Sequence, residues 1–163
     1  MSETLCAERP MGASDFDFIH DRWTVEHRKL ARRLVGSNEW LTFRGTVSGT
    51  PILGGLGNTD ENMLDDPSGA YEALTVRTFD PGSGEWSIVW IDGRDPKPDA
   101  PVRGHFVDGV GTFQGDDVLA GQPILVRFTW SGITPGTARW EQAFSADAGA
   151  TWELNWIMQF TRV

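Results

Sequence analysis

Residues 137–162 read TARWEQAFSADAGATWELNWIMQFTR, and this stretch decides the fold. Before its centre, Trp140, Gln142 and Phe144 stand at every second position, and a longer apolar row follows after it. That second row consists of Trp152, Leu154, Trp156, Met158 and Phe160. Period-two alternation is typical of β-strands that bury one face. The stretch therefore predicts two antiparallel strands with one apolar face each, joined by the turn SADAGATW.

The turn itself, Ser145–Trp152, has the form S-x-D-x-G-x-T-W and resembles the Asp-box of sialidases and other propeller proteins. A propeller needs at least about four blades of four strands, and its boxes repeat. The chain has 163 residues and carries the box once. We therefore interpret it as a hairpin turn in which Asp147 accepts hydrogen bonds from turn amides and Gly149 adopts a positive φ.

Working outward, turn signals such as DDPSG (65–69) and DPGSG (80–84) recur between short runs rich in Val, Ile, Thr, Phe and Trp. This spacing predicts an all-β domain of about ten strands, and the linkers are too short for crossover helices. The expected strands cover 22–34, 38–48, 56–64, 71–79, 85–92, 102–107, 110–118, 123–131, 137–145 and 151–162. One apolar face per strand favours an antiparallel up-and-down β-barrel that closes around its own interior.

The N-terminal region is expected to differ from the rest. A short helical turn is predicted over Asp15–His20, with Ser14 or Asp15 as its N-cap, and VSGTP (47–51) is read as a turn. Residues 1–13 are expected to form a flexible tail, and residues 14–163 a single barrel domain.

Composition narrows the function classes. The chain is 39% hydrophobic and 23% charged, without an apolar run of the roughly 20 residues that a membrane helix needs. The net charge of -9 disfavours nucleic-acid binding. Cys6 is the only cysteine, which excludes an internal disulfide and a Cys-rich zinc site, and no secretory signal is evident at the N-terminus. These features predict a cytoplasmic protein without membrane or nucleic-acid partners.

The stretch FDFIHDRWTVEHRKL (16–30) resembles the opening of calycins, the superfamily of lipocalin-like and fatty-acid-binding-like barrels. Lipocalins begin with Gly-x-Trp, whereas this chain has Asp21, Arg22 and Trp23. From about Phe16 to Arg162 the chain resembles bacterial lipocalin-like proteins of the DUF1579 type, in segments such as GLGNTDENML, FDPGSGEWSIVW, DGVGTFQGDD and ILVRFTW. The resemblance implies a β-barrel with an internal cavity and carries no catalytic residues over.

Three polar residues of one strand are the first candidates for a ligand site. Asn58, Asp60 and Asn62 share a face, although Asn and Asp are uncommon in strands. Inside a barrel they would form a polar wall of the pocket and would need partners. The alternatives are a solvent-facing edge, a loop, or an oxygen-ligand metal site, for which the spacing lacks an EF-hand pattern.

His27 is the second candidate. It shares a face with Trp23 and Val25, which predicts that it points inward as a hydrogen-bonding group or a general base. The alternative is a core or surface histidine that serves structure alone. The surrounding basic stretch HRKLARR (27–33) is interpreted either as a solvated face or as the attraction for a carboxylate or phosphate.

The remaining candidates lie on later strands. Arg139, Glu141 and Asn155 flank the SADAGATW hairpin, either as ordinary cross-strand pairs or with Glu141 as a buried acid/base. Arg77 and Arg127 are candidate inward counterions, and Trp90 shares an apolar face with Trp86 and Ile88. No organic cofactor and no metal are expected, with haem on His105 as the one alternative.

Three functions compete. The leading hypothesis is a barrel that binds a small, largely apolar and possibly anionic ligand among its aromatic residues, which include eight Trp and nine Phe. The second is a cofactor-independent isomerase, cyclase or hydrolase that uses His27 or Glu141 as acid/base in the same cavity. The third is an interaction protein whose exposed Trp and Phe rows form a homodimer patch.

Overall fold

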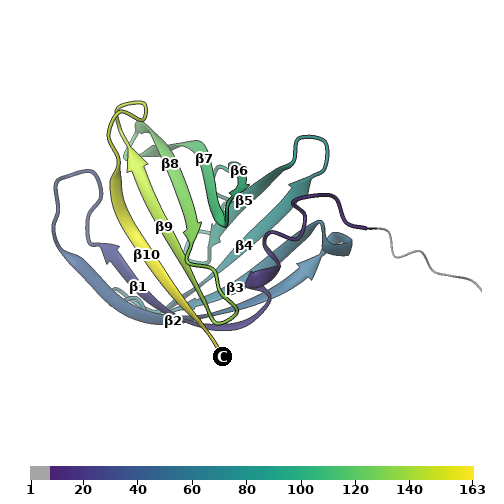
Figure 1. The fold of residues 1–163 in the computed structure, drawn as a ribbon. Helices are drawn as coiled ribbons and strands as arrows, with labels where there is room; N and C mark the ends of the chain where they lie inside the picture. Colours follow the sequence, from purple (N-terminus) through teal and green to yellow (C-terminus); the bar gives the residue numbers. More distant parts are fainter. Residues whose placement is uncertain (1–7) are drawn as a thin grey trace, which may run out of the picture.

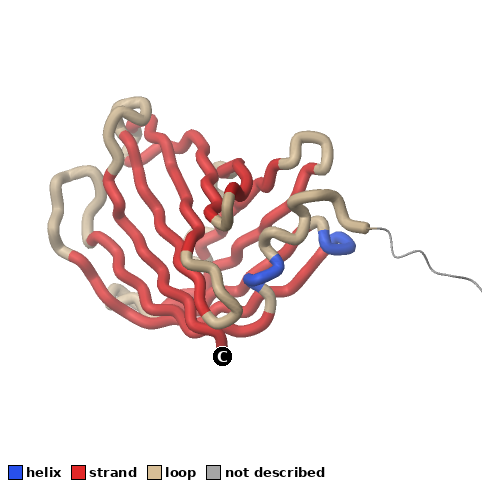
Figure 2. Tube along the Cα trace, in the orientation of Figure 1, coloured by secondary structure: helices blue, strands red, loops and turns tan. Residues whose placement is uncertain are grey.

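The computed structural model describes residues 8–163, and over this range ten antiparallel strands close into a barrel (Figures 1 and 2). Each strand pairs with its neighbours in the chain, and β1 pairs with β10 to close the ring. The strands are β1 (Asp21–Leu30), β2 (Trp40–Ile52), β3 (Gly57–Leu64), β4 (Tyr71–Asp80), β5 (Glu85–Asp92), β6 (Val102–Val107), β7 (Val110–Leu119), β8 (Gln122–Ser131), β9 (Thr137–Ser145) and β10 (Glu153–Arg162). The predicted all-β barrel is confirmed.

Two short 3-10 turns complete the fold, η1 (Asp17–Ile19) and η2 (Leu53–Gly55). The predicted helical turn therefore exists, but it is shorter than expected: it begins at Asp17, its N-cap residue is Phe16 instead of Ser14 or Asp15, and no side chain caps it. Neither turn in residues 8–163 has the length and hydrophobicity to cross a membrane.

The SADAGATW segment forms the hairpin turn between β9 and β10, as predicted. The Asp147 carboxylate accepts hydrogen bonds from the Thr151 amide at 2.8 Å and from the Ser145 hydroxyl at 2.8 Å. Gly149 adopts a φ of 90°. Hydrogen bonds from Thr151, then from Ser145, lower the pKa of Asp147 to about 2. The motif is part of the architecture.

The apolar row predicted for the last strand is interrupted. A β-bulge lies between Leu154, which pairs with Ala143, and Trp156, which pairs with Gln142. The bulge contains one extra residue, Asn155, which is fully buried, while Leu154 is 38% exposed. A bulge shifts the alternation by one residue, so Leu154 does not share the buried face of Trp156, Met158 and Phe160, as the unbroken row predicted.

One end of the barrel is closed by the segment before β1, drawn in purple in Figure 1. Phe16 is completely buried and makes edge contacts with Trp86 and Phe106 at 5.0 and 4.9 Å between ring centroids. Ala13 is also buried, and the Gly12 carbonyl accepts a hydrogen bond from the Trp86 indole at 3.1 Å. Gly12 and Ala13 thus pack on the barrel, although they fall within the expected tail over 1–13. Residues 1–7, including Cys6, lie outside the described residues.

The same end explains why VSGTP (47–51) is not a turn. These residues belong to β2, and a Cβ at Gly49 would stand 2.1 Å from the Ile19 carbonyl oxygen. The glycine therefore allows the N-terminal segment to approach the strand closely rather than allowing the chain to reverse. The first strand also ends earlier than predicted, at Leu30, where Ala31 bonds back to Glu39 across a loop.

The other end of the barrel is open. It is bordered by the loops that follow β1, β3, β5, β7 and β9, because antiparallel strands place alternate connections at the same end. The candidate site lies within this rim.

Candidate functional site

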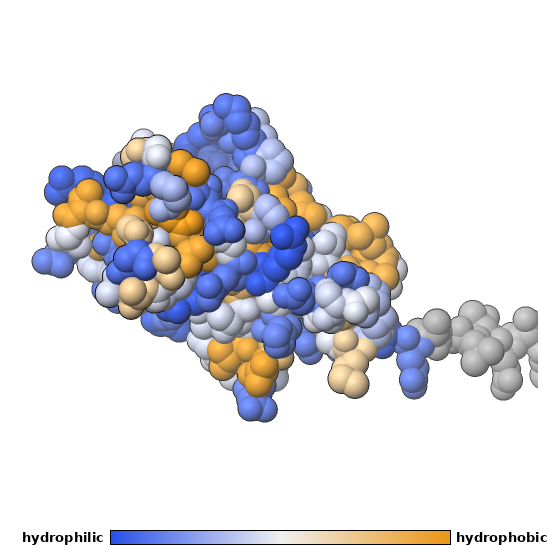
Figure 3. All heavy atoms as spheres, turned by 90° about the horizontal axis from the view of Figure 1, so that it is seen from above, coloured by the Kyte–Doolittle hydropathy of each residue, from blue (hydrophilic) through white to orange (hydrophobic). Residues whose placement is uncertain are grey.

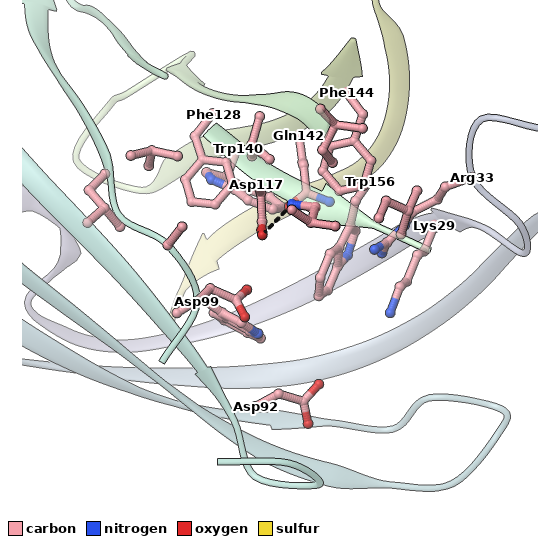
Figure 4. Close-up of a pocket in the computed structure, with 18 of the residues that line it drawn as sticks. Lys29, Arg33, Asp92, Asp99, Asp117, Phe128, Trp140, Gln142, Phe144 and Trp156 are labelled. Atoms are coloured by element: carbon pink, nitrogen blue, oxygen red, sulfur yellow. Dashed lines mark hydrogen bonds between the residues drawn. The ribbon is translucent and has the colours of Figure 1, made fainter. Parts of the chain in front are cut away.

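A pocket of about 220 Å³ enters the barrel between the loops of the open end (Figure 4). Its walls combine aromatic rings with charged side chains of both signs. The residues that concern its chemistry are Lys29, Arg33, Tyr71, Trp90, Asp92, Arg94, Asp99, Asp117, Phe128, Trp140, Gln142, Phe144 and Trp156. Pockets for drug-sized molecules measure roughly 300–1,000 Å³, so this one fits a small molecule.

Three tryptophans form the rigid part of the pocket. The ring of Trp156 meets Trp90 edge-on at 5.8 Å and Trp140 edge-on at 5.5 Å between centroids. Strands β5, β9 and β10 each supply one of these rings at the inward position of their alternation. Perpendicular aromatic contacts of this kind fix ring orientation, and they present flat apolar faces to whatever enters.

His27 does not line the pocket, but it fixes the position of Trp156. The Trp156 indole N–H donates to His27 Nδ1 at 3.1 Å, and the imidazole stacks on Phe43 at 4.5 Å between centroids. Burial, then the charge of Lys29, lowers the pKa of His27 to about 4. The imidazole is therefore neutral near pH 7, with its proton on Nε2, because Nδ1 must accept the indole hydrogen.

The basic wall consists of Lys29 and Arg33. Lys29 Nζ lies 4.3 Å from the Trp156 ring centroid and 3.8 Å from an Asp66 carboxylate oxygen. The Arg33 guanidinium lies over the rings of Phe144 and Trp156, at 5.4 and 5.7 Å. Its Nη2 is buried and has no hydrogen-bond partner among residues 8–163. Burial lowers the pKa of both groups, that of Lys29 to about 8.

The acidic wall consists of Asp99 and Asp117. Neither carboxylate takes part in an ion pair within the described part of the chain, whereas the neighbouring Asp92 is paired with Arg94 at 2.7 Å. Asp117 accepts one hydrogen bond, from the Val118 amide at 2.7 Å, drawn as the dashed line in Figure 4. Burial, then the like charge of Asp117, raises the pKa of Asp99.

The closed end holds a different polar cluster, in which the charges are paired. Arg77 is 4% exposed and its Nη1 donates to Asp60 at 2.5 Å and to Asn58 at 2.9 Å. Asn62 donates to the other Asp60 oxygen at 2.6 Å. The guanidinium also lies 5.0 Å from the centroid of Phe16, the residue that closes this end. Arg77 and Asp60 therefore form a buried ion pair that each of the two asparagines joins with a hydrogen bond.

A second cavity of about 30 Å³ separates this cluster from the pocket, with Trp90, Phe128 and Trp140 shared between the two. Two buried donors that line it, Arg77 Nε and Trp130 Nε1, have no partner in the described residues. Its volume suits about one or two water molecules.

Of the residues predicted to bind a ligand, four lie together in the structure, and the others lie apart from them. Asn58, Asp60, Asn62 and Arg77 form the buried cluster, so the alternative of a solvent-facing edge or loop for the first three is wrong. Trp90 alone among the predicted ligand residues lines the open pocket. His27 points inward as expected but lies under Trp156 and does not line this pocket.

Further predicted residues lie away from the pocket. Trp23 is buried near the closed end, where its indole donates to the Ile19 carbonyl at 3.2 Å. Asn155 is buried beside the pocket and accepts a hydrogen bond from the pocket residue Gln142 at 2.9 Å. This is the only side-chain hydrogen bond of Asn155 that the described residues show.

Four predictions about inward-facing groups are corrected. Arg139 and Glu141 alternate with the inward Trp140 and pair with each other on the outer face, at 2.7 Å. Glu141 therefore does not enter the cavity as an acid/base. Arg127 stacks on Trp152 at 4.1 Å on the outer face of β8, and His105 is exposed on β6, where its side chain alternates with the buried Val102 and Gly104.

The charged residues of the pocket were not nominated from the sequence individually. Lys29 occupies the next inward position after Trp23, Val25 and His27, so the alternation carried a signal for it. Asp99 lies in the loop DGRDPKPDAP (92–101) that leads into β6, a stretch typical of solvated turns. No local pattern distinguishes its carboxylate from those of exposed turn residues, since only closure of the barrel places it in the pocket.

The outer surface of residues 8–163 has a hollow that is larger than the pocket, but it has no row of exposed aromatic side chains. A depression of about 840 Å³ runs over the outer face of β2 to β5, beside Met63, Leu74 and Ile91. The large hydrophobic residues exposed in the described range are Met, Val and Leu, without Trp or Phe. On the face drawn in Figure 3, hydrophobic patches alternate with hydrophilic ones. The row of exposed Trp and Phe on which the homodimer hypothesis was based is thus absent from residues 8–163.

Neither a cluster of metal ligands nor a similar protein indicates what the pocket binds. Within residues 8–163 no three His, Cys, Asp or Glu side chains converge as metal ligands would. No protein-family model matches the chain, and no curated protein matches it.

Proposed function

We propose that the protein binds a small, largely apolar anion in the open end of its barrel. The observation that carries the proposal is Arg33, whose buried Nη2 has no partner and whose guanidinium lies on the aromatic wall of the pocket. Leaving a buried donor without a hydrogen-bond partner costs about 1–3 kcal/mol, and more when the group is charged. An anionic ligand would remove that cost while its apolar body contacts the tryptophan rings.

Lys29 supports the same interpretation. Its pKa is lowered to about 8 because it is buried and stands near Arg33. Two cations within one pocket repel each other, and an anion placed between them stabilises both. A carboxylate suits this position because it can accept hydrogen bonds from a guanidinium and an ammonium at once.

The fold is compatible with this function, since calycin-like barrels hold ligands in their interiors. The resemblance to DUF1579-type lipocalin-like proteins and the cytoplasmic location of the protein also belong to the proposal. The alternative of an enzyme that uses His27 or Glu141 as acid/base receives less support. Glu141 faces outward, and His27, with a pKa of about 4, is covered by Trp156 and Phe43.

The test is quenching of tryptophan fluorescence by 4-methylbenzoate, with the neutral 4-methylbenzamide as the matched ligand. We expect saturable quenching by the benzoate alone. Replacement Arg33→Gln should weaken binding roughly tenfold, the effect of losing one hydrogen bond to a charged group. Arg32→Gln is the control, because Arg32 is the exposed neighbour. Equal binding of both ligands, or equal loss in both variants, would refute the proposal.

A further inference from the structure

We propose that the ligand carries a second, cationic group at the end opposite its anion, so that it bridges the pocket from the basic wall to the acidic wall. This inference rests on the proposed function and defines its ligand more narrowly. The chemical class is a flat apolar molecule with a carboxylate at one end and a protonated amine at the other.

The order of strands places the two walls on opposite sides. Lys29 belongs to β1, and Arg33 lies in the loop that follows it, whereas Asp99 precedes β6. In the closed ring, β6 stands five places from β1 in either direction. Asp117 lies on β7, the next strand to β6. Figure 4 shows the same division, with Asp99 and Asp117 on one side of Trp156 and the two cations on the other.

The charges of the two walls form no ion pair with each other within residues 8–163, although Arg33 and Asp99 attract each other across the pocket. Arg33 on the basic side and both Asp99 and Asp117 on the acidic side lack an ion pair within the described part of the chain. This contrasts with Asp92 and Arg94, which lie on the rim and pair with each other. Opposite charges held apart in one pocket form a template for a molecule with two charged ends.

The surface between the walls is apolar. The rings of Trp90, Trp140 and Trp156 line the pocket, and the first two each stand perpendicular to Trp156. An α-amino acid carries its ammonium and its carboxylate on the same carbon atom, so its two charges cannot lie on opposite sides of the indole rings. A ring substituted at opposite positions separates its charges and covers the indoles with its flat face.

The acidic pair also favours a cation over a second neutral group. Asp99 and Asp117 are like charges in a partly buried site, and the repulsion between them contributes to the raised pKa of Asp99. An ammonium placed beside them offsets this repulsion, as an alkyl group does not. Its binding therefore lowers the free energy of the acidic wall as well as that of the ligand.

The experiment measures dissociation constants of three ligands that share one skeleton: 4-(aminomethyl)benzoate, 4-methylbenzoate and 4-methylbenzylamine. We expect the first to bind at least tenfold more tightly than the second, and the second more tightly than the third. If 4-methylbenzoate binds as tightly as 4-(aminomethyl)benzoate, the inference is overturned while the proposed function stands. If neither carboxylate binds, both are overturned.

Two variants test whether Asp99 and Asp117 bind the ammonium group of the ligand. Asp99→Asn and Asp117→Asn should reduce the affinity for 4-(aminomethyl)benzoate to that for 4-methylbenzoate and leave the latter within about twofold of its original value. Asp116→Asn is the control, since Asp116 is exposed on the opposite face of the same strand. An equal loss for both ligands in the Asn variants would assign the carboxylates a structural role and contradict the inference.

Discussion

The two ends of the barrel differ in whether their charged side chains form ion pairs. At the closed end, Arg77 and Asp60 are almost completely buried and bond to each other and to two asparagines. At the open end, Arg33 is partly buried and Asp99 is exposed, and neither has an ion-pair partner among residues 8–163. A buried charge with partners maintains a structure, whereas charges left apart in an accessible pocket indicate a ligand.

The aromatic residues show the same contrast. Phe16 fills the closed end among Trp86, Phe106 and Phe113, with its ring centroid within 5.5 Å of each of theirs. At the open end, Trp90 and Trp156 instead border a pocket of about 220 Å³. One end therefore resembles a protein core, and the other resembles a binding site.

The largest expected effect comes from breaking the buried ion pair at the closed end. Replacement Asp60→Ala should lower the free energy of unfolding by about 3–5 kcal/mol, because it leaves Arg77 charged and unpaired. Urea denaturation measures the change. Glu141→Ala, which breaks the outer pair with Arg139, should cost about 1 kcal/mol or less. Similar losses in the two variants would remove the distinction between core and surface pairs.

The next effect is the pH dependence of His27, which supports the open pocket from within. Its pKa falls from 6.5 in the unfolded chain to about 4 in the folded protein. Between these values the unfolded chain binds more protons, so His27 contributes stability above pH 6.5 that is lost as the pH falls to about 4. The contribution is about 3 kcal/mol at most.

Denaturation of the original protein and of His27→Phe, each measured between pH 7 and pH 4, isolates this contribution. The original should lose more stability over this range than the variant. His105→Gln, a change at an exposed histidine of β6, is the control and should leave the profile of the original unchanged. Parallel profiles for the original and His27→Phe would show that His27 is not buried as a neutral group.

The smallest effect on stability is expected at the open end. Arg33→Gln removes an unpaired charge, so the free energy of unfolding should stay the same or rise by up to about 1 kcal/mol, although 4-methylbenzoate should bind roughly tenfold more weakly. Parallel urea denaturation and fluorescence titration give the two quantities. A loss of several kcal/mol would show that Arg33 belongs to the core and would favour a structural role for the pocket charges.

The sequence predicted the architecture well because strands and turns leave local signals. The alternation around Trp140 and the turn chemistry of Asp147 and Gly149 predict the hairpin correctly. The polar face of β3 also predicts a cluster, and the structure supplies its partner, Arg77. These signals depend on neighbouring residues in one strand or turn, which is why they can be read without a structure.

The open pocket could not be predicted in the same way. The bulge at Asn155 changes which side chains face inward, and the alternation does not indicate where it occurs. Arg33 and Asp99 lie in loops, where charged residues are normally solvated. They meet in one pocket only because the ring closes, which depends on pairing between β1 and β10 at opposite ends of the chain.

The most direct test of the difference between the two ends uses the tryptophan indoles as reporters. In an ¹H–¹⁵N spectrum, titration with 4-methylbenzoate should shift the indole signals of Trp90, Trp140 and Trp156, which border the pocket. The signals of Trp23 and Trp86 should stay in place, because their indoles donate to the Ile19 and Gly12 carbonyls at the closed end. Shifts confined to Trp23 and Trp86, or an unchanged spectrum at saturating ligand, would contradict the assignment of binding to the open end.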